Sequence, residues 1–175
     1  PNLVAVHDFS SEGVPIYLIM ELITGGTLRE LLAERGPMPA HAAAAVMHPM
    51  LMGLDEVHRT GLVHRDIKPD NVLITSHNRV KLGDFGLVRS AAAEQASNQI
   101  VGTVSYLSPE QVTGEPITPE SDVYSAGVVL FELLTGTVPF SGATPMEHAT
   151  ARLHADVPAP SSRIAGVPKL FDALV

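Results

Sequence analysis

Two short polar segments, and the distance between them, constrain this chain more than any other feature. The first is residues 64–71, HRDIKPDN, and the second is residues 84–86, DFG, which begins thirteen residues after Asn71. Between them, residues 71–75 and 80–83 alternate like the two strands of a hairpin, around a polar turn at 76–79. Such a hairpin brings the two polar segments to neighbouring loops of one fold.

The side chains in these segments suit one kind of chemistry. Asn71 and Asp84 carry oxygen ligands for a hard cation such as Mg²⁺, which keeps waters and phosphate oxygens in its other positions. Lys68 offers a compact positive charge to a phosphoryl oxygen, and Asp66 can accept a proton from an attacking hydroxyl group. Together they predict metal-assisted phosphoryl transfer.

In this order and spacing the residues resemble those of eukaryotic-type (Hanks-type) protein kinases, most closely the bacterial Ser/Thr kinases, over essentially the whole chain. The resemblance implies ATP and Mg²⁺ as cofactors. It implies that Asp66 is the catalytic base, that Lys68 contacts the γ-phosphate, and that Asn71 and Asp84 hold the metal. Residues 108–110, SPE, are similar to the Ala-Pro-Glu that closes the activation segment of such kinases, with serine in place of alanine.

The resemblance also implies a nucleotide site and its support. Residues 20–23, MELI, are similar to a gatekeeper and hinge. Met20 is then the gatekeeper, backbone groups of Glu21 and Ile23 meet adenine, and Leu73 packs beneath the base. Asp122, at the head of an apolar helix, is expected to cap that helix and to hold the backbone of the loop at residues 64–65.

We expect an α+β fold with the architecture of a truncated kinase. Two short hairpins are predicted, from residues 3–9 with 16–22 and from residues 71–75 with 80–83. Helices are predicted over 27–35, 39–59 with a kink at Pro49, 120–135 ended by Gly136, and 145–154, with a helical turn after Glu110 and a last short helix. Residues 87–105 are predicted to form a long mobile loop.

By resemblance, residues 1–23 are a remnant of the small lobe, its fourth and fifth strands and the hinge. Residues 24–175 are the mainly helical large lobe, truncated at its C-terminal end. Val6 and Phe85 are expected in a buried apolar column, with His64 packed against Phe85. The family's Gly-rich loop, strand lysine and helix glutamate are missing, since the first lysine of the chain is Lys68. An arginine to pair with Glu110 is missing too, so we expect the isolated chain to be inactive.

The composition of the chain argues against three kinds of partner: nucleic acids, a lipid bilayer and thiolate-bound metals. The chain has 11 Lys and Arg against 19 Asp and Glu, a formal net charge of −8, which argues against a nucleic-acid partner held by phosphate contacts. The longest apolar stretch, residues 125–131, is too short to span a bilayer, so we expect a cytoplasmic kinase domain, with any membrane anchor in another part of the parent protein. With no cysteine the chain has no thiolate metal site, and its eight histidines lack the spacing of a helical zinc site.

Several features concern the substrate. Lys68, together with residues 102–103, GT, resembles the branch of the family specific for Ser and Thr, which implies protein substrates with Ser or Thr acceptors. Arg65 beside the base resembles kinases whose activation loop is ordered by phosphorylation, and Ser97 is the best-placed acceptor for self-phosphorylation, although a solvated loop serine fits equally well. Between Arg89 and Arg152 there are seven acidic residues and no Lys or Arg. This stretch either favours basic substrates or is a solvated acidic face.

Two alternatives remain open at this stage. A pseudokinase or scaffold of the same fold would bind partners without transferring phosphate, and the sequence upstream, where the strand lysine belongs, discriminates it. A small-molecule phosphotransferase also shares the fold. Against it stand Lys68 and the long segment 87–110, which suits a peptide lying across the site.

Overall fold

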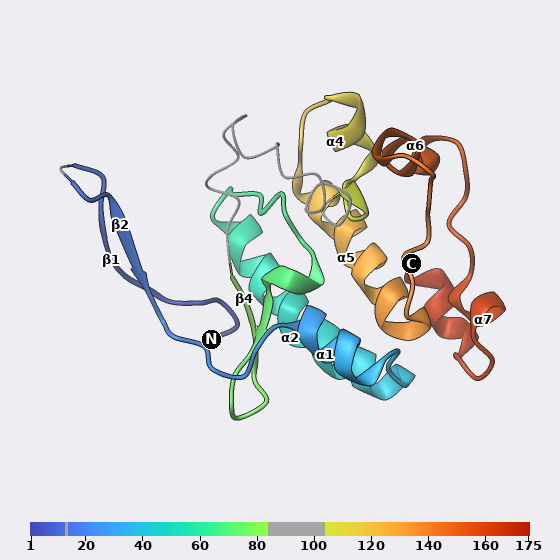
Figure 1. The fold of residues 1–175 in the computed structure, drawn as a ribbon, viewed down its shortest axis with the longest axis horizontal. Helices are drawn as coiled ribbons and strands as arrows, with labels where there is room; N and C mark the ends of the chain where they lie inside the picture. Colours follow the sequence, from blue (N-terminus) through green and yellow to red (C-terminus); the bar gives the residue numbers. More distant parts are fainter. Residues whose placement is uncertain (13, 84–103) are drawn as a thin grey trace.

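Two long helices, α2 (Ala40–Arg59) and α5 (Pro119–Thr135), pack against each other at the centre of the fold (Figure 1). The computed structural model describes residues 1–12, 14–83 and 104–175. Helix α5 is buried over most of its surface, as expected for a helix that is apolar nearly all round. Helix α2 buries one face and continues as one helix through Pro49, where a kink stays a prediction.

Local signals define the ends of two helices. Helix α1 (Leu28–Arg35) begins after Thr27, whose Oγ1 accepts a hydrogen bond from the Glu30 backbone N–H at 3.1 Å, while the Glu30 carboxylate accepts one from the Thr27 N–H at 2.8 Å. Helix α5 ends at Gly136, which has a φ of 75°. Both ends were predicted. The start of α5 lies within one residue of the predicted Glu120, but the predicted cap is wrong. Thr118 is the cap, and Asp122 lies in the first turn.

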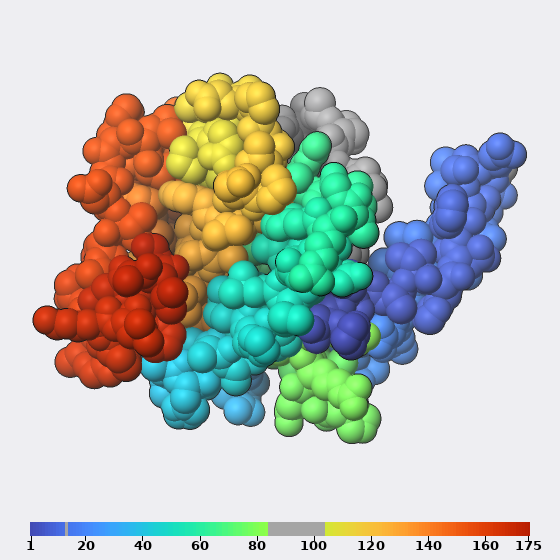
Figure 2. All heavy atoms as spheres, turned by 180° about the vertical axis from the view of Figure 1, so that it is seen from behind, coloured from blue at the N-terminus to red at the C-terminus, as the bar shows by residue number. Residues whose placement is uncertain are grey.

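The strands form two separate antiparallel hairpins, β1 (Val6–Ser10) with β2 (Tyr17–Met20), and β3 (Val72–Ile74) with β4 (Val80–Leu82). The second packs on α2, and its residue Leu82 bridges to Leu3 near the start of the chain. The first projects away from the helical body (Figures 1 and 2).

The prediction that Val6 is buried is wrong. Its side chain is 52% exposed, and every residue of β2 is exposed as well. The physical reason is that no second layer covers this hairpin in the described part of the chain, so its apolar side chains face solvent.

Short elements complete the fold. The chain enters β3 through a 3-10 turn, η1 (Pro69–Asn71). The helix predicted over residues 145–154 is present as α6 (Pro145–Thr150), continued by the 3-10 turn η3 (Ala151–Leu153). The remaining short elements are α4 (Pro109–Thr113), α7 (Pro160–Arg163) and η4 (Lys169–Ala173). In the ranges that the structure describes, no helix is both long and apolar enough to cross a lipid bilayer.

Gly25 sets the close approach of the α1 entry to the second hairpin. A Cβ atom on this residue would lie 2.2 Å from the carbonyl oxygen of Ile74 and 2.7 Å from the carbonyl carbon of Thr75, both of which are backbone atoms. We expect Gly25→Ala to lower the free energy of unfolding by about 1–3 kcal/mol, because the backbones must separate. Urea denaturation measures it.

Gly127, inside α5, is the matched control for this substitution. The nearest heavy atom to a Cβ there, outside its own helix, is 4.0 Å away. Gly127→Ala should therefore leave stability unchanged or raise it by about 0.5–1 kcal/mol, since alanine favours the helix. Equal losses for the two variants would contradict the close-approach argument.

His148 of α6 makes the fold sensitive to pH. Burial lowers the pKa of its imidazole below the ordinary value, and the nearby Arg152 guanidinium lowers it further. Its Nε2 lies 3.0 Å from the Ser105 hydroxyl oxygen. The unfolded chain therefore binds a proton more readily than the folded one, so this contribution to stability is complete above the unfolded pKa of about 6.5 and is lost as the pH falls below it.

We expect the free energy of unfolding to fall between pH 7.5 and pH 5.5, and to fall less in His148→Gln. Chemical denaturation at both pH values measures it. The same fall in the wild type and the variant would show that His148 is not responsible.

Candidate active site

The loop at residues 64–71 brings three of the predicted site residues into contact. Lys68 Nζ lies 2.8 Å from Asp66 Oδ2, and Asn71 Nδ2 donates to the same oxygen at 3.0 Å and to the Asp66 carbonyl oxygen at 2.7 Å. The side chains of Asp66 and Lys68 are 21% and 18% exposed, so both reach solvent at the edge of the fold. A carboxylate held in this way has one oxygen committed to the protein and a position open to a ligand.

The turn η1 sets the spacing between these side chains. Pro69 occupies its first position, where a missing N–H costs no hydrogen bond, and the Asn71 N–H donates to the Lys68 carbonyl at 3.0 Å. The Asn71 carbonyl then accepts from the Gly83 N–H at 2.9 Å. The turn thus brings Lys68 and Asn71 to the same oxygen of Asp66 and ties Asn71 to the end of β4.

Asp122 holds the backbone ahead of Asp66, as the resemblance implied. Its two carboxylate oxygens accept hydrogen bonds from the backbone N–H groups of His64 and Arg65, both at 2.7 Å. Arg65 has a φ of 70°, a backbone conformation that L-residues rarely adopt. The buried carboxylate therefore stabilises an unfavourable backbone conformation directly beside the base.

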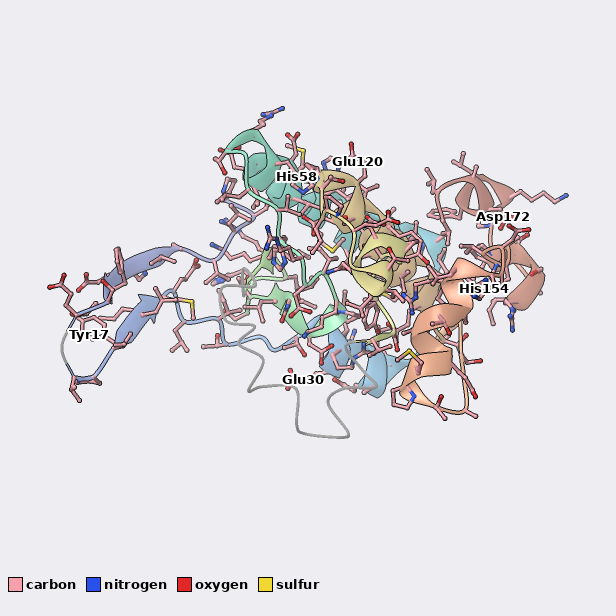
Figure 3. The ribbon with its side chains drawn as sticks, turned by 90° about the horizontal axis from the view of Figure 1, so that it is seen from above. Tyr17, Glu30, His58, Glu120, His154 and Asp172 are labelled. Carbon is pink, nitrogen blue, oxygen red and sulfur yellow. The ribbon has the colours of Figure 1, made fainter. Side chains whose placement is uncertain are left out.

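A second residue supports Asp122 and was missed by the sequence analysis. His58 Nε2, near the end of α2, lies 2.8 Å from Asp122 Oδ2. Figure 3 shows His58 beside Glu120 at the start of α5. The sequence analysis considered this histidine only as a zinc ligand, since no signal in the chain links positions that are 64 residues apart.

The loop is also joined to the residue before Asp84. His64 is buried, as expected, and its Nε2 lies 2.9 Å from the Gly83 carbonyl oxygen. Asp84 itself, Phe85, Ser97 and Thr103 lie outside the described residues. The roles predicted for them therefore remain predictions.

The described residues supply one of the ligands that a hard cation would need, the side-chain oxygen of Asn71. Asn71 uses its amide nitrogen to bind Asp66, and no hydrogen bond among the described residues uses its Oδ1, an oxygen of the type that Mg²⁺ prefers. The described ranges contain no cluster of three His, Cys, Asp or Glu side chains that could hold a metal. A cation at Asn71 therefore needs further oxygens, as Asp84 and nucleotide phosphates would supply.

The predicted hinge follows β2. The Glu21 N–H donates to the Ala5 carbonyl at 2.8 Å, and the Glu21 carboxylate accepts from Lys81 Nζ at 2.6 Å. The hydrogen bond from Lys81 lowers the pKa of Glu21, with a further contribution from the Ala5 N–H. Within the described ranges, no hydrogen bond uses the Glu21 carbonyl or the backbone of Ile23, and the adenine contacts expected of them remain predictions.

The Leu73 side chain lies beside Gly83, and the cavity next to the hinge does not include it. A cavity of about 470 Å³ lies between residues 21–24 and the β3–β4 turn. None of the catalytic-loop residues lines it, and neither does Leu73, so we do not assign the nucleotide to this cavity.

Segment 104–107, which precedes α4, is held by an arginine of the turn η3. The guanidinium of Arg152, in η3, donates to the carbonyl oxygens of Val104 at 2.9 Å and Ser105 at 3.2 Å, and to that of Leu107. Arg152 is buried, and burial lowers its pKa below the ordinary value for arginine. These three hydrogen bonds fix the backbone conformation of residues 104–107.

Glu110 closes the segment. The Ser121 hydroxyl donates to its carboxylate. Burial alone would raise the pKa of Glu110, but the hydrogen bonds from Ser121, from its own backbone and from Ser108 outweigh burial and lower it. Ser108 caps α4, with Gln111 completing a capping box.

An ionic cluster beside the catalytic loop was also missed. Arg29 Nη1 lies 2.7 Å from Glu132 Oε1, and Arg29 Nε lies 3.3 Å from Asp70 Oδ2. The Tyr106 hydroxyl donates to Glu132 Oε2 at 2.5 Å and accepts a hydrogen bond from Arg29. Burial alone would lower the pKa of Arg29, but the bonds to Glu132 and Tyr106 outweigh it and raise the pKa, so Arg29 stays charged.

This fold and this loop define a protein kinase domain. Residues 1–165 match the family described as the protein kinase domain, and the chain belongs to that family, as the sequence resemblance predicted.

The relatives are bacterial. The chain is 57% identical over 175 residues to "Serine/threonine-protein kinase PknL" of Mycobacterium tuberculosis, with 99% of the chain and 44% of that protein aligned. It is 40% identical to "Serine/threonine-protein kinase PknB" of Mycobacterium leprae, with 100% of the chain and 29% of that protein aligned. It is 36% identical to "Serine/threonine-protein kinase PrkC" of Bacillus subtilis, with 100% and 27% aligned. The chain thus spans less than half the length of these relatives.

Proposed function

We propose that the protein containing this chain transfers the γ-phosphoryl group of ATP to Ser or Thr hydroxyl groups of protein substrates. The observation that carries the proposal is the convergence of Lys68 and Asn71 on one oxygen of Asp66. Membership of the protein kinase family and the likeness to three kinases named for Ser and Thr support it.

Asp66 is the proposed proton acceptor. Its Oδ2 accepts two hydrogen bonds, from Lys68 and Asn71, whereas its Oδ1 accepts none among the described residues. Oδ1 is therefore the atom for the proton of the substrate hydroxyl, and the two bonds to Oδ2 fix the orientation of the carboxylate. The two oxygens of Asp66 differ in role because Asn71, five residues later, binds Oδ2 and not Oδ1.

Lys68 and the metal ligands complete the proposed chemistry. The Lys68 ammonium has further donors after binding Asp66, and one of them can reach a phosphoryl oxygen of ATP. Mg²⁺, held by Asn71 and Asp84, would neutralise negative charge on the phosphates. We also propose that Glu21 and Ile23 bind adenine through their backbone and that Met20 and Leu73 border the base.

Other parts of the proposal extend beyond the site. Residues 1–23 belong to the small lobe and hinge, residues 24–175 to the large lobe, and the kinase domain acts in the cytoplasm. Ser97 is proposed as a self-phosphorylation site. The projecting β1–β2 hairpin, with its exposed apolar side chains, supports the division into lobes because it lacks a covering layer in the described chain.

The full-length protein, incubated with Mg²⁺ and ATP labelled at the γ-position, tests the proposal. We expect label on phosphoserine or phosphothreonine of a generic basic protein and on the protein itself at Ser97. Absence of transfer with retained ATP binding would instead indicate a pseudokinase. Label on an aminoglycoside but on no protein would indicate a small-molecule phosphotransferase.

A further inference from the structure

The peptide group between Arg65 and Asp66 is held at both of its polar atoms. The Arg65 carbonyl oxygen accepts a hydrogen bond from Gln111 Nε2 at 2.9 Å, and the Asp66 N–H donates to His64 Nδ1 at 3.4 Å. Because a peptide group is planar, holding its oxygen also fixes the direction of its N–H and the position of the next Cα atom. That Cα atom belongs to Asp66, the proposed proton acceptor.

This peptide group needs support because of the residue before it. Arg65 has a φ of 70°, a conformation that persists in an L-residue only where its surroundings hold it. Asp122 accepts a hydrogen bond from the Arg65 N–H at 2.7 Å, and Gln111 donates one to the Arg65 carbonyl. The two side chains thus bind opposite ends of Arg65, one from α5 and one from α4. Without Gln111, the peptide group that follows Arg65 can rotate about the Arg65 ψ.

The capping box of α4 fixes the side chain of Gln111. Its Oε1 accepts hydrogen bonds from the Ser108 N–H at 2.9 Å and from the Ser108 hydroxyl at 3.2 Å. Ser108 is fully buried, and it follows Leu107, whose carbonyl accepts a hydrogen bond from Arg152. With Oε1 committed to these donors, Nε2 is the atom that remains for the Arg65 carbonyl.

The capping box alone does not explain why position 111 carries glutamine. Glutamate serves as well as glutamine at the third position of a capping box, and Glu30 does so in α1. The Arg65 carbonyl needs a donor, however, and an ionised carboxylate has none. Of the two side chains, only the amide offers an acceptor to Ser108 and a donor to Arg65 at the same time.

We propose that Gln111 is a positioning residue for phosphate transfer: its amide connects the buried start of α4 to the Arg65 carbonyl and thereby fixes the peptide group that orients Asp66. The inference rests on the proposed kinase function and extends it to a residue outside the catalytic loop. Gln111 acts through the backbone beside Asp66. A change at Gln111 should therefore lower kcat rather than the affinity for ATP.

Gln111→Glu in the full-length protein tests the proposal. The carboxylate keeps the capping box but has no donor for the Arg65 carbonyl, so we expect kcat to fall about 10- to 100-fold, as misplacement of a reacting group by up to about 1 Å would cause. The KM for ATP and the midpoint of urea denaturation should stay close to those of the wild type. Thr113→Glu adds the same charge at an exposed position of the same helix, and it should leave kcat within about twofold.

The pH dependence of this variant gives a readout that a merely structural role would not produce. A protonated carboxyl has an O–H that can donate to the Arg65 carbonyl, while its other oxygen still accepts from the Ser108 N–H. The ratio of variant to wild-type kcat should therefore rise as the pH falls from 8 to 5.5, toward the ordinary glutamate pKa of about 4.3. The ratio removes the effects of His148 and of ATP protonation, which both proteins share.

Two results would overturn the inference. One is a kcat for Gln111→Glu equal to that of Thr113→Glu, and the other is a loss of kcat whose ratio to the wild type does not change with pH. If Gln111→Glu does not fold, Gln111→Ala, which removes both hydrogen bonds, must lower kcat with the KM for ATP unchanged. An unchanged kcat in that variant would equally refute the positioning role.

Hydrogen exchange separates a failure of this inference from a failure of the proposed function. If the wild type transfers no phosphate, the proposed function fails, and the backbone amides of residues 64–71 still report on the loop. Mass spectrometry should show faster exchange of these amides in Gln111→Glu than in Thr113→Glu, because the loop has lost one of its supports. Equal exchange in the two variants would show that Gln111 does not fix the loop.

Discussion

Replacing Asp66 with asparagine lowers the rate of phosphate transfer by the full-length protein by about 10²- to 10⁴-fold, the range that a positioned general base contributes. Asparagine keeps the shape of the side chain and an oxygen for the bonds from Lys68 and Asn71, but it cannot accept the proton of the substrate hydroxyl. We therefore expect the loss in kcat, with KM for ATP and thermal stability close to those of the wild type. Initial rates at saturating ATP measure it.

The matched control is Asp55→Asn. Asp55 lies on α2, is half-exposed, and pairs with Arg59 one turn later. Its replacement should leave the rate within twofold, because an exposed pair on a helix contributes well under 1 kcal/mol. An Asp66→Asn variant as active as Asp55→Asn would remove the basis of the proposed function.

Asp122→Ala is expected to have the largest effect on stability. The carboxylate is buried and accepts two backbone N–H groups and a contact from His58. Alanine removes the acceptor of the buried His64 N–H and of the partly buried Arg65 N–H, so we expect the free energy of unfolding to fall by about 3–5 kcal/mol. Urea denaturation of the full-length protein, followed by the transition of the kinase domain, measures the loss.

The same substitution separates a positioning role from a purely structural one. Since Asp122 stabilises the positive φ of Arg65, the folded variant should lose kcat far more than it loses affinity for ATP. His58→Gln, which removes one contact and keeps both backbone bonds, should lose less of each quantity. A variant that is destabilised but turns over normally once folded would show that the backbone beside Asp66 does not depend on Asp122.

The elements that could be predicted are those whose signals are local. Thr27 with Glu30 three residues later, and Gly136 after an apolar run, define helix ends within a few residues of sequence, and the structure has both. The catalytic loop belongs to this group, because Asp66, Lys68 and Asn71 lie within six residues and one 3-10 turn sets their spacing. The role of Asp122 is the exception, since it came from the family resemblance.

The features that could not be predicted depend on contacts between distant positions. Arg29 meets Asp70, Tyr106 and Glu132 across 41, 77 and 103 residues, and its helix carries no pattern that distinguishes it from a solvated arginine. His58 meets Asp122 in the same way. The burial of Val6 was predicted wrongly for a related reason, because the apolar column that the family resemblance implies depends on packing partners that no described element supplies to this hairpin.

The contacts of Arg152 have a consequence for how kinases of this type can diversify. The hydrogen bonds from its guanidinium to segment 104–107 all go to main-chain oxygens, and those oxygens are present whatever the side chains are. Positions such as Val104 and Leu107 can therefore exchange one residue for another over evolution while the chain there keeps its course. One arginine on a remote turn thus allows the neighbouring surface to vary in chemistry at constant shape.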